Sequence, residues 1–157
     1  MSTAAILSIK PVYSNQILAG TKTIELRKST MGLNPGDVVV VYSSAPEQVI
    51  KFWFVVKEIE TLRVSELWDK YQSQLGIGHE EYEDYFRGQE SAVALHVGQL
   101  HPVTPIPLKQ LIRLVPGFVP PQGLVWLRDD FGKFEPLVSA LSTPLPGHLF
   151  AQHSFAF

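Results

Sequence analysis

Short apolar and β-branched runs recur along this chain, and most of them are separated by turn residues rather than by regular helical segments. Runs of this kind predict β-strands, because successive side chains of a strand point to opposite faces and a buried strand is apolar on both. We expect strands at residues 5–9, 21–27, 38–44, 51–60 and 91–100, with a last strand inside residues 117–127.

Other segments place their apolar residues three or four positions apart, which predicts helices. We expect helices at residues 11–19, 65–75, 78–88 and 105–114. Pro11 suits the first turn of a helix, Gly20 suits the position just after one, and Ser65 suits an N-cap. The strands outnumber the helices and have irregular connections, so the sequence predicts an α+β fold: a curved mixed sheet or β-barrel with peripheral helices.

Residues 128–157 have a weaker pattern than the rest of the chain. The stretch PLVSAL is a short helix candidate. Five phenylalanines predict that this segment packs against the domain: Phe131, Phe134, Phe150, Phe155 and Phe157. We therefore expect one domain over residues 1–127 and a C-terminal extension over 128–157 that packs on it.

The amino-acid composition argues against several kinds of site and function. The 157 residues contain no cysteine, which excludes disulfides and thiolate metal sites, and the five histidines form no ligand pair such as HExxH. We expect neither a metal nor a cofactor. No apolar run approaches the roughly 18 residues of a membrane span, and the N-terminus lacks the basic region of a signal peptide. A cytoplasmic protein without a membrane partner is the expectation.

The net charge of −2 hides an uneven distribution. Residues 1–30 carry four basic side chains against one acidic one, whereas residues 57–90 carry nine acidic against four basic ones. A small basic surface suits one phosphate or a few nucleotides better than a long duplex. The acidic block is expected to be a solvated helical surface.

The sequence GTKTIELRK, residues 20–28, concentrates charge within a predicted strand. Lys22 can hold a phosphate, or act as a base if burial lowers its pKa. Glu25 can accept a proton or bind an amino group of a base, and Arg27 can contact a phosphate through two N–H groups. A purely structural ion pair among them is the main alternative. Lys22 and Glu25 have opposite parity, so a bend or bulge near Ile24 is expected if both face one cleft.

Four further residues are candidate ligand contacts. Lys10 precedes the helix at Pro11, whose N-terminus attracts anions. Tyr42, Ser43 and Ser44 end a strongly β-prone run, where their hydroxyls suit a base or phosphate. A surface lysine and an ordinary turn before Pro46 are the alternatives for these positions.

The spacing G-x-K-x-x-E-x-R, here Gly20, Lys22, Glu25 and Arg27, resembles the hallmark of the ASCH domain family, whose fold is similar to that of the PUA RNA-binding domain. LSIKPVYSNQILAG, VVVVYSSAP, AVALHVGQL and PPQG resemble further segments of the family in the same order, as found in its bacterial and archaeal branch of predicted transcriptional regulators. The resemblance covers about residues 5–127. It implies a β-barrel with a cleft that these hallmark residues line, and RNA, a nucleotide or a modified nucleoside as the ligand.

Family members differ in activity, so two functions remain open. The first is an RNA- or nucleotide-binding domain with a small basic cleft. The second is a hydrolase that uses Lys22 and Glu25 as acid and base on N4-acetylcytidine-type amides or RNA phosphodiesters. Small amidohydrolase members have a threonine where Glu25 stands and also use a distant glutamate, which the sequence does not locate. A third alternative is an interaction domain with a vestigial cleft, against which the intact motif speaks.

Overall fold

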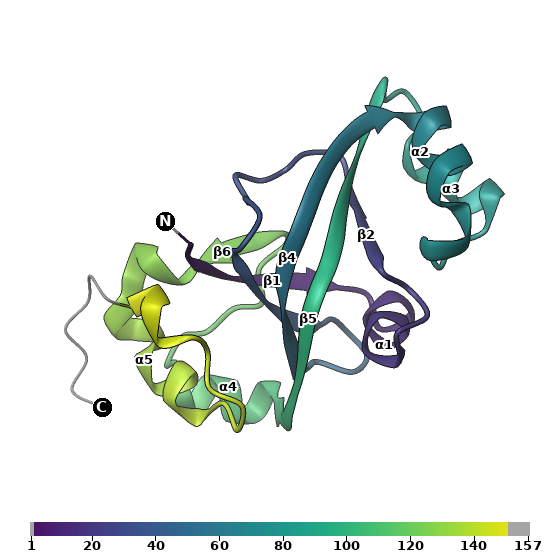
Figure 1. The fold of residues 1–157 in the computed structure, drawn as a ribbon. Helices are drawn as coiled ribbons and strands as arrows, with labels where there is room; N and C mark the ends of the chain where they lie inside the picture. The colour runs from purple at the N-terminus through teal and green to yellow at the C-terminus, as the bar shows by residue number, and fades with distance from the viewer. Residues whose placement is uncertain (1, 151–157) are drawn as a thin grey trace.

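The computed structural model describes residues 2–150, which fold around one six-stranded mixed sheet (Figure 1). The strand order is β2-β5-β4-β3-β1-β6. The strands are β1 (Ala4–Ile9), β2 (Ile24–Arg27), β3 (Val38–Ser43), β4 (Val49–Arg63), β5 (Ser91–Pro107) and β6 (Leu124–Trp126). Only β1 and β3 are parallel, and the other neighbours are antiparallel. The predicted curved mixed sheet is confirmed.

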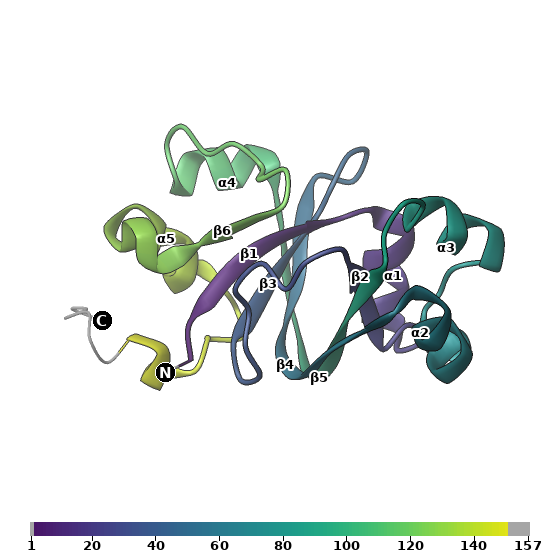
Figure 2. The ribbon, with the colours of Figure 1, turned by 90° about the horizontal axis from the view of Figure 1, so that it is seen from above.

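The longest strands, β4 and β5, form the backbone of the sheet. Their pairing shifts register at three places, and such irregularities bend a strand pair. Figure 2 shows the resulting curvature. Because β4 offers pairing partners as far as Val49, β5 continues through its prolines to Pro107 instead of ending at residue 100. The helix predicted from residue 105 therefore begins at residue 108.

Among the described residues, five helices lie around the sheet. They are α1 (Pro11–Ala19), α2 (Val64–Tyr71), α3 (His79–Tyr85), α4 (Leu108–Leu114) and α5 (Phe131–Ala140), with short 3-10 turns η1 (Gln72–Gln74), η2 (Leu127–Asp130) and η3 (Gly147–Phe150). Gly20 ends α1 as predicted, with φ of 83° and its N–H bonded to carbonyls of the last turn. Within residues 2–150, no helix is long and apolar enough to cross a bilayer.

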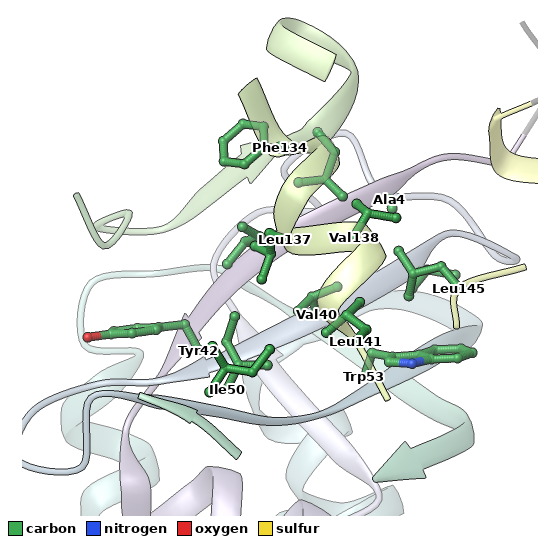
Figure 3. Packing of buried hydrophobic residues seen from close by; sticks show 14 of the residues in the cluster. Ala4, Val40, Tyr42, Ile50, Trp53, Phe134, Leu137, Val138, Leu141 and Leu145 are labelled. Carbon is green, nitrogen blue, oxygen red and sulfur yellow. The ribbon is translucent and has the colours of Figure 1, made fainter. Parts of the chain in front are cut away.

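One large apolar cluster lies between the sheet and helices α4 and α5 (Figure 3). Phe134, Leu137 and Val138 of α5 pack there against Val40 and Ile50 of the sheet. The C-terminal segment is also attached by the Trp53 indole, which donates to the Thr143 carbonyl at 2.9 Å.

The expected packing of the extension can be followed as far as residue 150. Phe134 and Phe150 are buried, and Phe131 packs against the same cluster. Phe155 and Phe157 lie outside the described residues. A domain boundary at residue 127 stays a prediction, because α5 shares its apolar cluster with β1, β3 and β4.

The opposite end of the sheet carries α1, α2 and α3 (Figure 1). Tyr82 and Phe86 pack with Ile24 and Leu26 of β2 in a separate apolar cluster, whereas Ile17 of α1 packs with residues of β1, β3 and β4. Residues of α1, α3 and the edge strand β2 border one region, which is where the candidate site lies.

Candidate functional site

A cleft of about 840 Å³ opens between β2, the end of β1, helices α1 and α3, and residues 120–122. Its volume is in the range of ordinary ligand pockets. Six of the seven residues proposed from the sequence line it: Lys10, Lys22, Glu25, Arg27, Tyr42 and Ser44. Ser43 does not. Segments far apart in the chain thus bring the hallmark motif and the end of β3 together.

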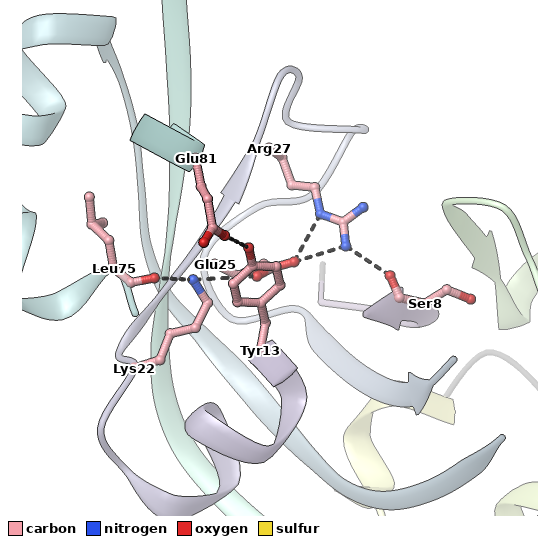
Figure 4. A network of polar contacts seen from close by, with 7 residues as sticks. All are labelled: Ser8, Tyr13, Lys22, Glu25, Arg27, Leu75 and Glu81. Atoms are coloured by element: carbon pink, nitrogen blue, oxygen red, sulfur yellow. Dashed lines mark hydrogen bonds and ion pairs between the residues drawn. The ribbon is translucent and has the colours of Figure 1, made fainter. Parts of the chain in front are cut away.

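Arg27 and Glu25 form the best-defined ion pair of the cleft (Figure 4). The Arg27 guanidinium donates to Glu25 Oε2 from Nε at 3.1 Å and from Nη2 at 2.9 Å. Nη2 also donates to the Ser8 carbonyl of β1 at 2.9 Å. Because β2 and β1 are not neighbours in the sheet, Arg27 joins two strands that the curvature brings close together.

Lys22 is a buried cation, with only 2% of the residue exposed. Its ammonium donates to the Leu75 carbonyl at 2.5 Å, lies 3.9 Å from Glu25 Oε1, and sits 5.1 Å from the centre of the Tyr13 ring. Burial lowers the pKa of Lys22, and Arg27 adds to this, while Glu25 opposes it. The arrangement joins three charges into one network with an excess of positive charge.

The strand predicted across residues 21–27 is shorter in the structure. This explains how Lys22 and Glu25 can face one cleft although their positions have opposite parity. β2 begins at Ile24, because the N–H groups of Lys22 and Thr23 bond to the Gln16 and Gln74 carbonyls instead of to a strand. Glu25 and Arg27 share one parity and line the cleft as expected. Lys22 reaches Glu25 from outside the strand, so no bulge at Ile24 is needed; β2 pairs with β5 in continuous register.

Gly76 explains how the backbone approaches Lys22 so closely. It has φ of +64°, and a Cβ there would lie 2.1 Å from Gln16 Oε1 and 3.2 Å from Lys22 Cβ. A larger residue would therefore be strained in conformation and in space. The loop after η1 thus depends on glycine to place the Leu75 carbonyl against the Lys22 ammonium.

Tyr42 presents a buried hydroxyl without a partner. The residue is 1% exposed, its ring packs edge-on against Phe118, and its hydroxyl oxygen has no hydrogen-bond partner among residues 2–150. Burial raises the pKa of Tyr42, so the hydroxyl stays protonated and able to donate. A buried hydroxyl that lacks a partner is rare and costly in a folded protein, and Tyr42 is one of the residues that line the cleft.

Ser43 has a structural environment instead. Its hydroxyl lies 2.7 Å from the Ser14 hydroxyl of α1 and donates to Glu47 at 2.7 Å. Glu47 also accepts from Asn15 at 3.0 Å and pairs with Lys51. This network fixes α1 to the turn after β3 and so supports one side of the cleft.

Helix α3 supplies site residues that the sequence reasoning missed. Glu81, Asp84 and Tyr85 line the cleft, whereas the acidic block around them was expected to be only a solvated surface. Their i, i+3, i+4 spacing puts them on one helix face, which is different from the face of the buried Tyr82 and Phe86. This spacing is the feature of the sequence from which these cleft residues could have been predicted.

The acidic residues of α3 change the charge of the cleft. Three basic side chains line it, Lys10, Lys22 and Arg27, and three acidic ones, Glu25, Glu81 and Asp84. The Tyr13 hydroxyl donates to Glu81 at 3.3 Å, and burial followed by this carboxylate raises the pKa of Tyr13. The formal charges along the cleft therefore balance. Exposed Lys10 stands just before α1, whose N-terminus has no side-chain cap.

Metal ligands of suitable spacing occur elsewhere. Glu58, Glu60 and His96 offer ligand atoms within 4.8 Å of one another, but none of them lines the cleft. Glu60 already accepts from Tyr71, Lys70 and His96. We interpret this group as a structural network that joins α2 to β4 and β5.

The curved mixed sheet, with a charged motif at a cleft beside its edge strand, defines a PUA-like class of fold. The ASCH domain family model matches residues 7–101, which is more than half of the chain. The chain therefore belongs to the ASCH domain family. This match ends before residue 127.

Two kinds of relative support the assignment. A Zymomonas mobilis protein called an ASCH domain-containing ribonuclease is 30% identical over 126 residues, which are 80% of this chain and 85% of that protein. The crystal structure of ASCH from Zymomonas mobilis matches with a TM-score of 0.81 and 29% identity, over 91% of this chain and 99% of that one. A tyrosine-to-phenylalanine mutant of the same protein matches with a TM-score of 0.80 and 29% identity, over 89% and 99% of the two chains.

Proposed function

We propose that the cleft binds single-stranded RNA by taking in one nucleotide. The observation that carries this proposal is the buried hydroxyl of the cleft-lining residue Tyr42, which has no hydrogen-bond partner among residues 2–150. Such a group costs about 1–3 kcal/mol when unsatisfied. A bound nucleotide has several polar atoms that can accept its proton.

The charged groups of the cleft favour contact with only a few phosphates. Lys10, at the exposed start of α1, suits a phosphate because cations and helix N-termini both attract anions. Arg27 is fixed by Glu25 and the Ser8 carbonyl, so its remaining N–H groups have a defined direction. Because the charges of the cleft balance, we expect RNA to neutralise one or two of these cations and no more.

The test is a titration of a fluorescent mixed-sequence RNA oligomer. We expect a slope of about −0.7 in log affinity against log salt for each phosphate that is contacted. The double variant Lys10→Ala/Arg27→Ala should weaken binding about tenfold or more. The matched control Lys109→Ala/Arg113→Ala removes two cations of α4 that do not line the cleft and should change affinity less than twofold. Equal effects of the two double variants would place the RNA elsewhere.

A second candidate is cleavage of the bound RNA, favoured by the ribonuclease name of the relative at 30% identity. In such a reaction the ribose 2′-oxygen attacks the phosphorus, its proton goes to a base, and the 5′-oxygen leaves after taking a proton from an acid. Lys22 and Glu25 are the candidate pair. We rank catalysis below binding, because Glu25 is held by Arg27 and Lys22 is held by the Leu75 carbonyl.

Product analysis separates binding from catalysis. Purified protein is incubated with mixed RNA and, separately, with N4-acetylcytidine, and products are followed by chromatography. Binding without turnover supports the first proposal. RNA turnover that is lost in both Lys22→Ala and Glu25→Gln would make this a ribonuclease, and turnover of N4-acetylcytidine would make it an amidohydrolase.

A further inference from the structure

The two sides of the cleft carry opposite charge. On the β1 and β2 side, Lys10, Lys22 and Arg27 outnumber Glu25, whereas Glu81 and Asp84 stand on α3. We propose that this separation orients a bound nucleotide, with its phosphate toward Lys10 and an exocyclic amino group of its base toward Glu81 and Asp84. The cleft then prefers bases with an amino group over uracil. This inference rests on the proposed RNA-binding function.

The carboxylates of α3 can bind only hydrogen-bond donors. An ionised carboxylate only accepts hydrogen bonds, so it attracts N–H groups and repels a phosphate. Glu81 Oε2 accepts from Tyr13, while Oε1 has no hydrogen-bond partner among residues 2–150 (Figure 4). Asp84 pairs with Arg87 on the exposed side of α3. Glu81 therefore has a free acceptor atom at the cleft.

The base of the nucleotide is expected to lie against tyrosine rings. Tyr13 of α1 and Tyr85 of α3 both line the cleft, and the Tyr13 hydroxyl donates to Glu81. Aromatic rings provide stacking surfaces for bases of unpaired nucleotides. A base against these tyrosines has its polar edge near α3, and its phosphate is then directed away from the negative side.

The Tyr42 hydroxyl is an independent sign that a polar ligand belongs here. It is buried and has no partner among the described residues, and Tyr42 lines the same cleft. The carboxylates of α3 and this hydroxyl offer opposite polarity, since the tyrosine donates and the carboxylates accept. A nucleotide with both donors and acceptors can satisfy both.

Cytosine and uracil give the sharpest comparison, because an amino group at position 4 of cytosine is a carbonyl oxygen in uracil. A carboxylate accepts from that amino group but faces the lone pairs of the carbonyl. We expect cytidine monophosphate to bind about fivefold or more tightly than uridine monophosphate. Glu81→Gln should lower this ratio to about one or reverse it, because the amide can donate to the carbonyl of uracil.

The experiment is a calorimetric titration of both nucleotides into wild-type protein, Glu81→Gln and the control Glu83→Gln. Glu83 lies on the same helix, pairs with His79 and does not line the cleft, so its variant should keep the wild-type ratio. Equal affinity of both nucleotides for the wild type overturns this inference and leaves the binding function standing. An unchanged ratio in Glu81→Gln also overturns it. If neither nucleotide binds and RNA does not bind, the proposed function fails as well.

Discussion

The apolar cluster beneath α4 and α5 and the cleft beside β2 are held together by different forces. The cluster is stabilised by burial of apolar side chains such as Phe134 and Leu137. The cleft contains the buried charges of Lys22 and Glu25, whose removal from water is compensated by the Arg27 guanidinium, the Leu75 carbonyl and their mutual contact. The comparison teaches that the cluster serves stability, while the cleft keeps polar groups in fixed positions.

Tyr42 belongs to both regions. Its ring is part of the apolar cluster and its hydroxyl points away from the other labelled cluster residues (Figure 3), while Tyr42 also lines the cleft. The packed ring holds the hydroxyl in place although nothing in residues 2–150 binds it. Changes in the cluster should therefore affect stability alone, and changes in the cleft should affect binding.

The largest effect on stability is expected from Phe134→Ala. Loss of this buried ring should lower the free energy of unfolding by about 4 kcal/mol. RNA affinity, measured well below the melting temperature, should stay within twofold of wild type. Denaturant unfolding checks the first value, with the exposed Val119→Ala as a control that should change little. A loss of affinity in folded Phe134→Ala would mean that the two regions are not independent.

Glu25→Gln should affect both properties. It leaves Lys22 and Arg27 as two neighbouring cations with no anionic partner between them, which should cost about 3 kcal/mol of unfolding free energy. RNA binding should weaken too, because the Arg27 guanidinium loses its charged anchor. The exposed Glu66→Gln, which breaks only a surface pair with Arg63, should have little effect on either measurement. Equal stability of the two variants would argue against a buried ion network.

The sequence predicts different shares of the fold and of the candidate site. The strand positions, Gly20 and the motif residues followed from local patterns, because strands and caps are set by nearby residues. The sequence could not show that β5 continues to Pro107, since that depends on its pairing with β4. It also left Glu81 and Asp84 unassigned, because only the packing of α3 against β2 brings them to the cleft. Ser43 was proposed from its position at the end of β3, but the side chain faces Ser14 and Glu47.

A smaller effect is expected in acid from Glu47, which supports the cleft from outside. Hydrogen bonds from Asn15 and Ser43 lower the pKa of Glu47 from 4.5 to about 2. Since the folded pKa is lower than the unfolded one, this stabilisation is present above pH 4.5 and is lost as the pH falls toward 2. Glu47→Gln should be less stable than wild type at neutral pH, and the difference should shrink over that interval. A difference that is independent of pH would contradict the assignment.

The most direct test of the central claim is Tyr42→Phe, measured for stability and RNA affinity in parallel. Removing a buried hydroxyl without a partner should leave the free energy of unfolding unchanged or raise it by about 1 kcal/mol, while RNA affinity falls about fivefold or more. This opposite response is the predicted result. A variant that is less stable than wild type and binds RNA with unchanged affinity would contradict the claim that this hydroxyl is held ready for a ligand.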